Sequence, residues 1–384
     1  MDFLNRAKAL QSSLIQWRRT LHACPEIGFD LPRTKALIFN ELKKMRLDPR
    51  EIGRGSIVAE IGPKTEDMIL LRADVDALAV SEKTDLHFRA NNGNMHACGH
   101  DLHAAMLLGA AALLKESEET LRRGVRLLFQ PAEEILQGAA DALSAGVCDG
   151  VSSAYMLHVT VNTKLPVGTV IVPPPGVVAP AADFFEITVH GKGCHGADPA
   201  SGIDPLSVSA RILLGLQHLP AREFPSGARA ALTVGTLQGG KSFNVIPDSA
   251  RLRGSLRCYG EDFRALLKTR VQEISHSLAT AFRARAEVSF PAGCPSLIND
   301  QALRNALPQS LKEILGKERV MVIDTPSGTA GSEDFAVISQ TVPSVMLAVA
   351  AGDPGVALHH PKVMFDEDAL PYGAAALAAL PLRG

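Results

Sequence analysis

Four side chains that bind metal ions well, His96, Cys98, His100 and His103, lie in the short stretch MHACGHDLH. Imidazole and thiolate groups suit borderline-soft divalent cations such as zinc. The apolar run AAMLLGAAALL follows at once and predicts a helix whose first turn carries Asp101. We predict a metal site here rather than a coincidence of residue types. A closed structural zinc site would need a further Cys/His pair, which the sequence lacks, so the other ligands must come from elsewhere in the chain.

Acidic side chains follow two apolar segments that we expect to be strands. Asp74 and Asp76 come just after residues 68–71, and the pair Glu133 and Glu134 follows directly after 124–130. Ligands bind at the carboxyl ends of strands in open α/β sheets. One glutamate of the pair can then bind metal while its neighbour takes a proton from water. Turn chemistry explains the aspartates equally well, and a solvated loop is the commoner environment of a Glu pair.

Further candidates lie later in the chain. His158 is near the exit of the apolar segment 154–160 and, as the third polar group at one expected sheet edge, is a candidate ligand. A lone His in such a strand is more often a core residue. His359 and His360 are adjacent, so we expect only one of them to enter a site. The acids of segment 331–334 precede a helix and are explained as its cap.

Composition narrows the function classes. The 384 residues are 46% hydrophobic and carry a net charge of −2, so nothing indicates nucleic acid or a membrane surface as a partner, and a small-molecule substrate is expected. No run is apolar enough to span a membrane, and the amphipathic N-terminus does not resemble a signal peptide. The six cysteines are irregularly scattered, which predicts a reduced, cytoplasmic protein.

The order of expected elements predicts an α/β protein with an inserted domain. Residues 1–182 form the first part of a catalytic domain, and residues 291–384 complete it. Between them, residues 183–290 follow the order β-α-β-β-α-β, which predicts a ferredoxin-like α+β domain.

The motifs, taken in order, resemble a known family. MHACGHDLH, FQPAEE, LHV, HGKGCHGADP, NVIPD, GSEDF and LHHP are similar to those of the two-metal amidohydrolases that include aminoacylases, hippurate hydrolase and auxin-conjugate hydrolases. RRTLHACPEIGFD and LLRADVDAL match the same branch, so the resemblance covers nearly the whole chain. It implies a mixed-sheet α/β/α zinc-peptidase-like catalytic domain with a lid that also forms a homodimer or higher homo-oligomer.

The resemblance also implies roles for individual residues. Glu133 corresponds to the general base. His195, in the inserted domain, corresponds to a residue that polarises the scissile carbonyl, often across a dimer, and Asn244 is a candidate for holding the substrate. The resemblance implies two divalent metal ions, with zinc, manganese, cobalt or nickel all suited to a mixed site. Their implied ligands are Cys98, His100, Glu134, His158 and His359.

Two departures from the family pattern stand out. The loop at residues 193–196 reads Gly-Cys-His-Gly, where relatives tend to have Gly-Gly-His-Ala. Relatives of the carboxypeptidase type have H-x-D where this chain has Arg72-Ala73-Asp74. We therefore expect Asp74 to support the metal site rather than to bind metal.

Together these features predict hydrolysis of the amide bond of an N-acyl amino acid, of the hippurate, N-acetyl or indole-acetyl type. Three alternatives remain open. They are a dipeptidase or carboxypeptidase, an aminohydrolase of an aromatic amine, and a metal-binding protein without turnover. The basic residues Arg251, Arg253 and Arg257 could meet a substrate carboxylate, although alternating arginines on a strand more often form a solvated face.

Overall fold

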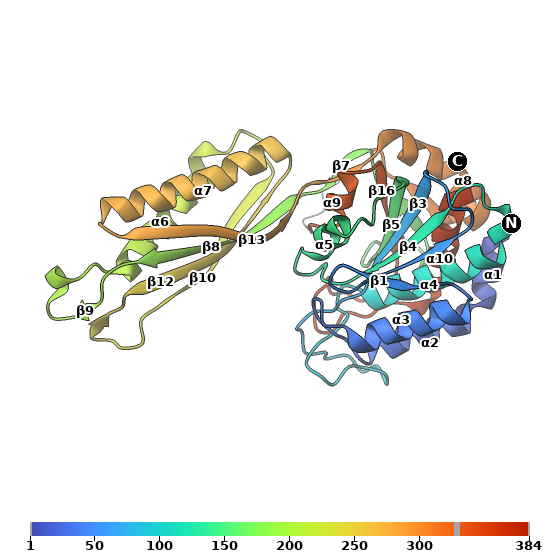
Figure 1. The fold of residues 1–384 in the computed structure, drawn as a ribbon, viewed down its shortest axis with the longest axis horizontal. Coiled ribbons are helices and arrows are strands. Elements are labelled where there is room, and N and C mark those ends of the chain that lie inside the picture. The colour runs from blue at the N-terminus through green and yellow to red at the C-terminus, as the bar shows by residue number, and fades with distance from the viewer. Residues whose placement is uncertain (1, 326–330, 383–384) are drawn as a thin grey trace. The chain divides into compact units, whose positions relative to one another are not determined.

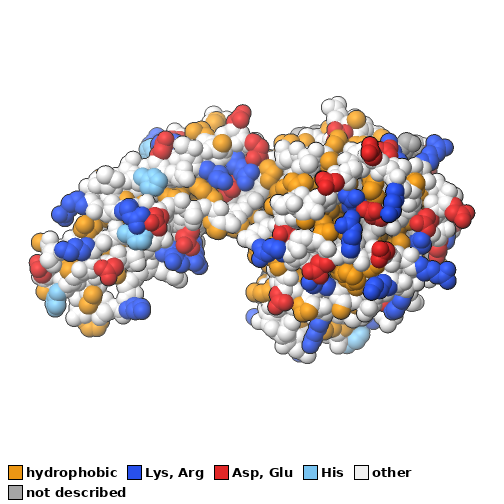
Figure 2. Space-filling model, in the orientation of Figure 1, with side chains coloured by type: hydrophobic (Ala, Val, Ile, Leu, Met, Phe, Trp, Pro, Cys, Tyr) orange, Lys and Arg blue, Asp and Glu red, His pale blue; other side chains and the backbone are white. Residues whose placement is uncertain are grey.

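The computed structural model describes residues 2–325 and 331–382, and the chain divides into two compact units. Unit 1 contains residues 1–178, 298–327 and 333–384, and unit 2 contains residues 179–297 and 328–332. None of the helices within the described ranges is long and apolar enough to cross a membrane. On the face drawn in Figure 2, acidic and basic side chains are interspersed in both units, in agreement with the small net charge.

Unit 1 is built on one mixed sheet of eight strands in the order β1-β2-β4-β3-β5-β16-β6-β15 (Figure 1). The pairs β3–β4, β3–β5, β5–β16 and β6–β15 are parallel, and the remaining pairs are antiparallel. The inner strands are rich in Val, Ile and Leu because both faces of the sheet are covered. The strands are β1 (Arg50–Ile52), β2 (Ser56–Ile61), β3 (Met68–Asp74), β4 (Val125–Gln130), β5 (Val151–Thr160), β6 (Val170–Val172), β15 (Val320–Val322) and β16 (Ser344–Ala350).

Helices cover this sheet on both faces, which confirms the predicted mixed-sheet α/β fold. Six helices share one hydrophobic core with the sheet, namely α1 (Phe3–Ala9), α2 (Gln11–His22), α3 (Pro32–Lys44), α4 (His100–Glu116), α8 (Gln301–Leu315) and α10 (Leu370–Ala379). Two short helices, α5 (Gly138–Ser144) and α9 (Ala336–Ser339), contact each other and pack on β4 and β16. Because side chains alternate along a strand, Ile69, Leu71 and Ala73 of β3 enter the six-helix core and Arg72 points to the opposite face.

Helix α4 carries the metal-binding motif and is almost wholly buried. It begins at His100, directly after Gly99 at φ 85°, and its first turn carries Asp101, as the sequence predicted. A Cβ atom on Gly99 would lie 2.4 Å from Cγ2 of Val159 and 3.2 Å from Cζ of Phe365. Glycine is therefore required twice at this helix start, once for its backbone conformation and once for space.

Unit 2 has its own core and follows the order β-α-β-β-α-β that the sequence predicts. Its antiparallel sheet has the strand order β10-β12-β8-β13, and helices α6 and α7 pack against each other and contact this sheet (Figure 1). These elements are β8 (Ala181–His190), α6 (Pro205–His218), β10 (Ala230–Gly239), β12 (Ser249–Cys258), α7 (Glu261–Ala281) and β13 (Arg285–Cys294).

The remaining elements are short. The strands β9 (Cys194–His195) and β11 (Val245–Ile246) pair with each other, as do β7 (Gly176–Ala179) and β14 (Leu297–Asn299). Single helical turns occupy Glu118–Thr120, Pro199–Ser201, Leu219–Glu223, Lys317–Arg319, Glu367–Ala369 and Leu380–Leu382.

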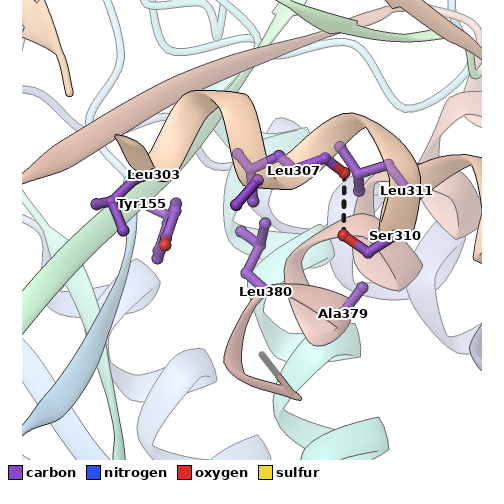
Figure 3. A pocket seen from close by; sticks show the side chains of 8 residues that line it. Tyr155, Leu303, Leu307, Ser310, Leu311, Ala379 and Leu380 are labelled. Carbon is purple, nitrogen blue, oxygen red and sulfur yellow. Dashed lines mark hydrogen bonds between the residues drawn. The ribbon is translucent and has the colours of Figure 1, made fainter. Parts of the chain in front are cut away.

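A small cavity of about 50 Å³ lies inside unit 1, where α8 and the end of α10 meet Tyr155 (Figure 3). Its lining is mainly aliphatic, and the Ser310 hydroxyl already donates to the carbonyl of Leu307 over 2.9 Å. The lining contains no metal-binding cluster, so this cavity belongs to the core and not to a reaction site.

Candidate metal centre

The five residues that the resemblance names as ligands come together in unit 1. They fall into overlapping groups whose ligand atoms lie within 4.8 Å of one another. Cys98 and His100 stand at the start of α4, Glu134 follows β4, His158 is near the end of β5, and His359 lies in the loop after β16. The groups are Cys98, His100 and His158; Cys98, Glu134 and His359; and His100, Glu133 and Glu134.

Two of the imidazoles are oriented by backbone carbonyls. Nδ1 of His100 lies 2.9 Å from the carbonyl oxygen of Asp76, and Nδ1 of His158 lies 2.6 Å from that of Val159. With Nδ1 as the donor, Nε2 of each ring carries a lone pair. Nε2 of His158 lies 3.5 Å from Sγ of Cys98, and Nε2 of His100 is buried without a hydrogen-bond partner among the described residues. This arrangement is typical of metal-binding histidines.

The carboxylate of Glu134 lies close to two of the candidate histidine ligands. Its Oε1 lies 3.8 Å from Nε2 of His100, and its Oε2 lies 3.7 Å from Nε2 of His359. Like Nε2 of His100, Oε1 of Glu134 is buried and has no hydrogen-bond partner within the described chain. Buried polar atoms are costly without a partner, so a nitrogen and an oxygen left in this state at one place fit a bound cation.

The electrostatics of the centre also fit divalent cations. Burial, together with the Glu134 carboxylate, raises the pKa of the Cys98 thiol far above its ordinary value. Burial raises the pKa of Glu134 to about 7. Both groups therefore tend to keep their protons near neutral pH when no cation is present, and a divalent cation favours their deprotonated forms.

The turn after β4 separates the two glutamates. Asp76 holds this turn, because its Oδ1 accepts the backbone N–H of Glu133 at 3.1 Å and its Oδ2 accepts that of Glu134 at 3.2 Å. Ala132 adopts φ 61°, a conformation that non-glycine residues rarely take. The strained turn sends the adjacent carboxylates to different neighbours, which is the separation that a ligand and a base require.

The Glu133 carboxylate lies close to other acidic side chains as well as to the His100 imidazole. The carboxylate is within 4.8 Å of ligand atoms of Glu333 and Asp334, and its Oε1 accepts the backbone N–H of Asp334 over 3.4 Å. Burial and the charges of these two acids raise its pKa well above the ordinary value. A carboxylate with a raised pKa can both take and return a proton near neutral pH.

Asp74 lies beside the ligands and is occupied by other partners. Its Oδ1 is 2.5 Å from Nδ1 of His103 and 3.8 Å from Nε2 of His100, and its Oδ2 accepts from Nη1 of Arg72 over 2.6 Å. Asp74, His100 and His103 are close enough to form a cation site of their own. However, Nε2 of His103 accepts the N–H of Val159 at 2.8 Å, so both nitrogens of His103 are already in use.

The other histidine of the motif, His96, lies apart from these ligand groups. It is buried, with its ring centroid 6.4 Å from that of His22. Nδ1 of His22 lies 2.8 Å from Oδ2 of Asp101, which also accepts from Nε of Arg18 at 2.9 Å. Glu26 accepts the backbone N–H groups of residues 33 and 34, at the start of α3. His22, Asp101 and Glu26 thus bond to neighbouring elements, whereas both ring nitrogens of His96 are buried without a hydrogen-bond partner among the described residues.

The candidates His195 and Asn244 belong to unit 2. His195 lies on β9, opposite Val245, and its Nδ1 accepts the N–H of Ala197 at 3.0 Å. The carbonyl of Asn244 accepts from Gly196 N–H at 2.8 Å, so the two candidate loops are joined by backbone bonds. Both side chains are exposed within their unit.

The three arginines of β12 already have partners. Arg251 and Arg253 form ion pairs with Glu186 at 3.4 and 2.7 Å, and Nη1 of Arg257 donates to Oγ of Ser332 at 2.9 Å. These contacts agree with a largely structural, solvent-facing role for the first two residues.

A comparison with known proteins identifies the family of this chain. The sequence model of Peptidase family M20/M25/M40 matches residues 70–383. The chain belongs to this family. The resemblance inferred from the motifs is thereby confirmed. The chain is similar to other members of the family over nearly its whole length.

Three family relatives illustrate the similarity. N-acetylcysteine deacetylase of Bacillus subtilis is 35% identical over 97% of this chain and 97% of its own. IAA-amino acid hydrolase ILR1-like 4 of Arabidopsis thaliana is 35% identical over 99% of this chain and 88% of its own. The crystal structure of a dinuclear metal binding peptidase of the M20 family from Bacillus subtilis superposes with a TM-score of 0.78, at 33% identity and with 98% of each chain covered.

Some residues at the candidate metal centre were not identified as site residues from the sequence. Arg72 was noted only as a departure from H-x-D, and Glu333 and Asp334 only as a helix cap. Oε1 of Glu333 does accept the N–H of Phe335 at 3.0 Å, as a cap would, but Asp334 is fully buried and contacts Arg72 at 2.8 Å. A buried Arg in an apolar strand was the available signal, since such a residue needs carboxylate partners.

Proposed function

We propose that the chain is a metal-dependent amidohydrolase that cleaves the amide bond of N-acyl amino acids. The observation that carries this proposal is the position of Glu133, which lies beside the ligand Glu134 yet is directed to a separate acidic environment. The names of the relatives, a deacetylase of N-acetylcysteine and a hydrolase of IAA-amino acids, support a substrate of this class.

The proposed cofactors are two divalent cations, held by Cys98, His100, Glu134, His158 and His359. The mixture of sulfur, nitrogen and oxygen ligands suits zinc, and manganese, cobalt and nickel are the other candidates. When bound, such cations supply the Lewis acidity that polarises a carbonyl group and acidifies water.

The protein's own residues then handle the proton. Glu133 takes a proton from the attacking water on its carboxylate and returns it to the nitrogen of the leaving amine. Two hydrogen bonds keep the Glu133 carboxylate in place. Its Oε1 accepts the backbone N–H of Asp334, and the backbone N–H of Glu133 donates to Asp76. The water oxygen bonds to the carbonyl carbon, the C–N bond breaks as the nitrogen is protonated, and the products are the free amine and a carboxylic acid that contains the water oxygen.

We further propose that residues 183–290 act as an inserted lid that supplies His195 and Asn244. In a neutral His195 ring the proton is on Nε2, because Nδ1 accepts the N–H of Ala197. Nε2 can therefore donate to the substrate's carbonyl oxygen as negative charge develops on it. Asn244 would hold the substrate by its side-chain amide.

The lid is also proposed to form a homodimer or higher homo-oligomer, and the protein to be cytoplasmic. Mixing Glu133→Ala with His195→Ala subunits tests whether His195 serves a neighbouring subunit. If it does, mixed dimers contain one intact site and regain activity that neither variant has alone. If His195 serves its own subunit, mixtures stay inactive.

Amine release from acetyl, benzoyl and indole-acetyl amino acids tests the function itself. The apo protein is resupplied with zinc, manganese, cobalt or nickel, with Glu133→Ala as the control. We expect turnover of one acyl class that needs both metal and Glu133, with a loss of about 10²- to 10⁴-fold in the variant. Turnover of dipeptides or aromatic amines alone would replace this proposal with a peptidase or an aminohydrolase. Metal binding without turnover of any substrate would indicate a binding protein.

A further inference from the structure

The turn that carries Glu133 and Glu134 is closed by a residue from the far end of the chain. Nε2 of Gln130, the last residue of β4, donates to both carboxylate oxygens of Asp334 at 2.9 Å. The backbone N–H of Ala139, in the first turn of α5, donates to Oδ2 of the same carboxylate at 2.8 Å. A single buried side chain thus joins the residues on either side of the turn.

Arg72 holds the Asp334 carboxylate through its guanidinium group. Its Nη2 donates to Oδ1 of Asp334 at 2.8 Å, and its Nε donates to Oε1 of Gln130 at 3.0 Å. Its Nη1 donates to Asp74 at 2.6 Å, and Asp74 in turn contacts the rings of His103 and His100. The planar guanidinium therefore links the carboxylate that closes the turn to the side of the centre that carries the imidazoles.

Helix capping does not explain Asp334. Its side-chain partners come from β3, β4 and α5, whereas Glu333 accepts the N–H of Phe335 at the start of α9 and lies 3.0 Å from Nη2 of Arg72. The backbone of Asp334 meanwhile donates to Oε1 of Glu133 and accepts from Val337. Asp334 thus contacts the residues on either side of the turn through its side chain and the Glu133 carboxylate through its backbone.

We propose that Asp334, held by Arg72, is a positioning residue that fixes the Glu133–Glu134 turn relative to the metal-binding histidines. The inference rests on the proposed function. Hydrogen-bonding partners one layer behind a metal site commonly contribute 10- to 100-fold to metal affinity or activity, because they fix the orientation of the groups in front. We expect an effect of that size from Asp334.

Asp334→Asn is the principal test, because it keeps the shape of the side chain and replaces one acceptor oxygen with a donor. The amide can no longer accept from Arg72, Gln130 and Ala139 together. We expect kcat to fall about 10- to 100-fold with KM changed less than about twofold. Hydrogen exchange of the amides in segment 131–139 should also become faster, both with and without added zinc.

Asp300→Asn is the matched control. Asp300 accepts the N–H of Leu303 at 2.8 Å and caps α8 in the same unit, outside the proposed site. Because asparagine caps helices about as well as aspartate, this variant should show neither slower turnover nor faster exchange in 131–139. Asp334→Ala serves as a second, more severe variant, and if it does not fold, Asp334→Asn decides the matter.

The proposal is overturned if folded Asp334→Asn keeps kcat within about twofold, or if exchange in 131–139 is unchanged. An equal loss of kcat in Asp300→Asn would also overturn it, because the effect would then not be specific to Asp334. If the wild-type enzyme hydrolyses no tested amide, the proposed function fails. The positioning role is then decided by exchange in 131–139 and by the zinc affinity of Asp334→Asn, so the two failures are distinguishable.

Discussion

Nδ1 of His103 donates a hydrogen bond to Oδ1 of Asp74, 2.5 Å away. The direction is fixed by the other nitrogen, since Nε2 accepts the backbone N–H of Val159 and cannot carry a proton. Burial lowers the pKa of His103 to about 4, so the ring is neutral at physiological pH. His103 therefore joins α4 to β3 and β5 from within the metal-binding motif.

His103→Ala is accordingly expected to destabilise the protein without emptying the centre. It leaves Oδ1 of Asp74 and the N–H of Val159 without their hydrogen-bond partner, which costs about 2 to 4 kcal/mol. Urea unfolding measures the loss, and elemental analysis measures the metal content per chain. A variant of unchanged stability with reduced metal content would make His103 a ligand instead.

Cys98→Ser tests the thiolate ligand. A hydroxyl is a poor substitute for a thiolate, so metal affinity should fall at least about tenfold, as measured by competition with a chelator. Cys258→Ser is the control, because Cys258 is also buried but lies on β12 of unit 2. Equal metal affinity in wild type and Cys98→Ser would remove Cys98 from the ligand set.

Gly99→Ala tests the close contact at the start of α4. The new Cβ would lie 2.4 Å from Cγ2 of Val159, in a backbone conformation of φ 85°. We expect a loss of about 2 to 4 kcal/mol in unfolding free energy. Gly93→Ala is the matched control, because Gly93 has the same φ but nothing within 4 Å of its Cβ position, and about 1 kcal/mol of backbone strain is expected there. Similar losses in both variants would contradict the packing argument.

Glu367→Gln tests a pH-dependent contribution to stability. Burial raises the pKa of Glu367, but hydrogen bonds from Arg19 and the charge of Arg18 outweigh burial and hold it below its ordinary value of 4.5. The folded state therefore gains stability from this carboxylate above pH 4.5, and the gain is lost as pH falls through the lower folded pKa. At pH 7 the variant should be less stable by about 1 to 3 kcal/mol.

Urea unfolding of both proteins from pH 7 to pH 3 measures this contribution. The difference between wild type and Glu367→Gln should be constant near neutral pH and should shrink at acidic pH. A difference that grows on acidification would mean that the folded pKa is raised and that the assignment of the ion pairs is wrong.

The fold and the imidazole side of the centre were accessible from sequence because their signals are local. Apolar runs ending in Asp74, Gln130 and His158 indicate strands that deliver polar groups to one sheet edge, and the parallel pairing of β3 with β4 and β5 brings these ends together. Likewise, the apolar run after the motif predicts a helix with Asp101 in its first turn, which is α4.

The contacts of Asp334 and Asp76 were not accessible from sequence for the opposite reason. Asp334 meets Gln130 across 204 positions of the chain, and nothing near Asp334 in the sequence distinguishes it from an ordinary helix cap. Similarly, Asp76 acts through backbone groups of Glu133 and Glu134, which leave no trace in residue types. Such contacts depend on tertiary structure, which periodicity and spacing do not encode.

The place of β16 between β5 and β6 has a consequence during protein synthesis. The ribosome finishes β5 roughly 180 residues before it makes β16, which at about 5–20 residues per second is a delay of roughly 10 to 40 seconds. During that interval a long hydrophobic strand has an unpaired edge, a known hazard for aggregation. We therefore expect newly made chains to need chaperone protection until the last forty or so residues, which contain β16, begin to emerge.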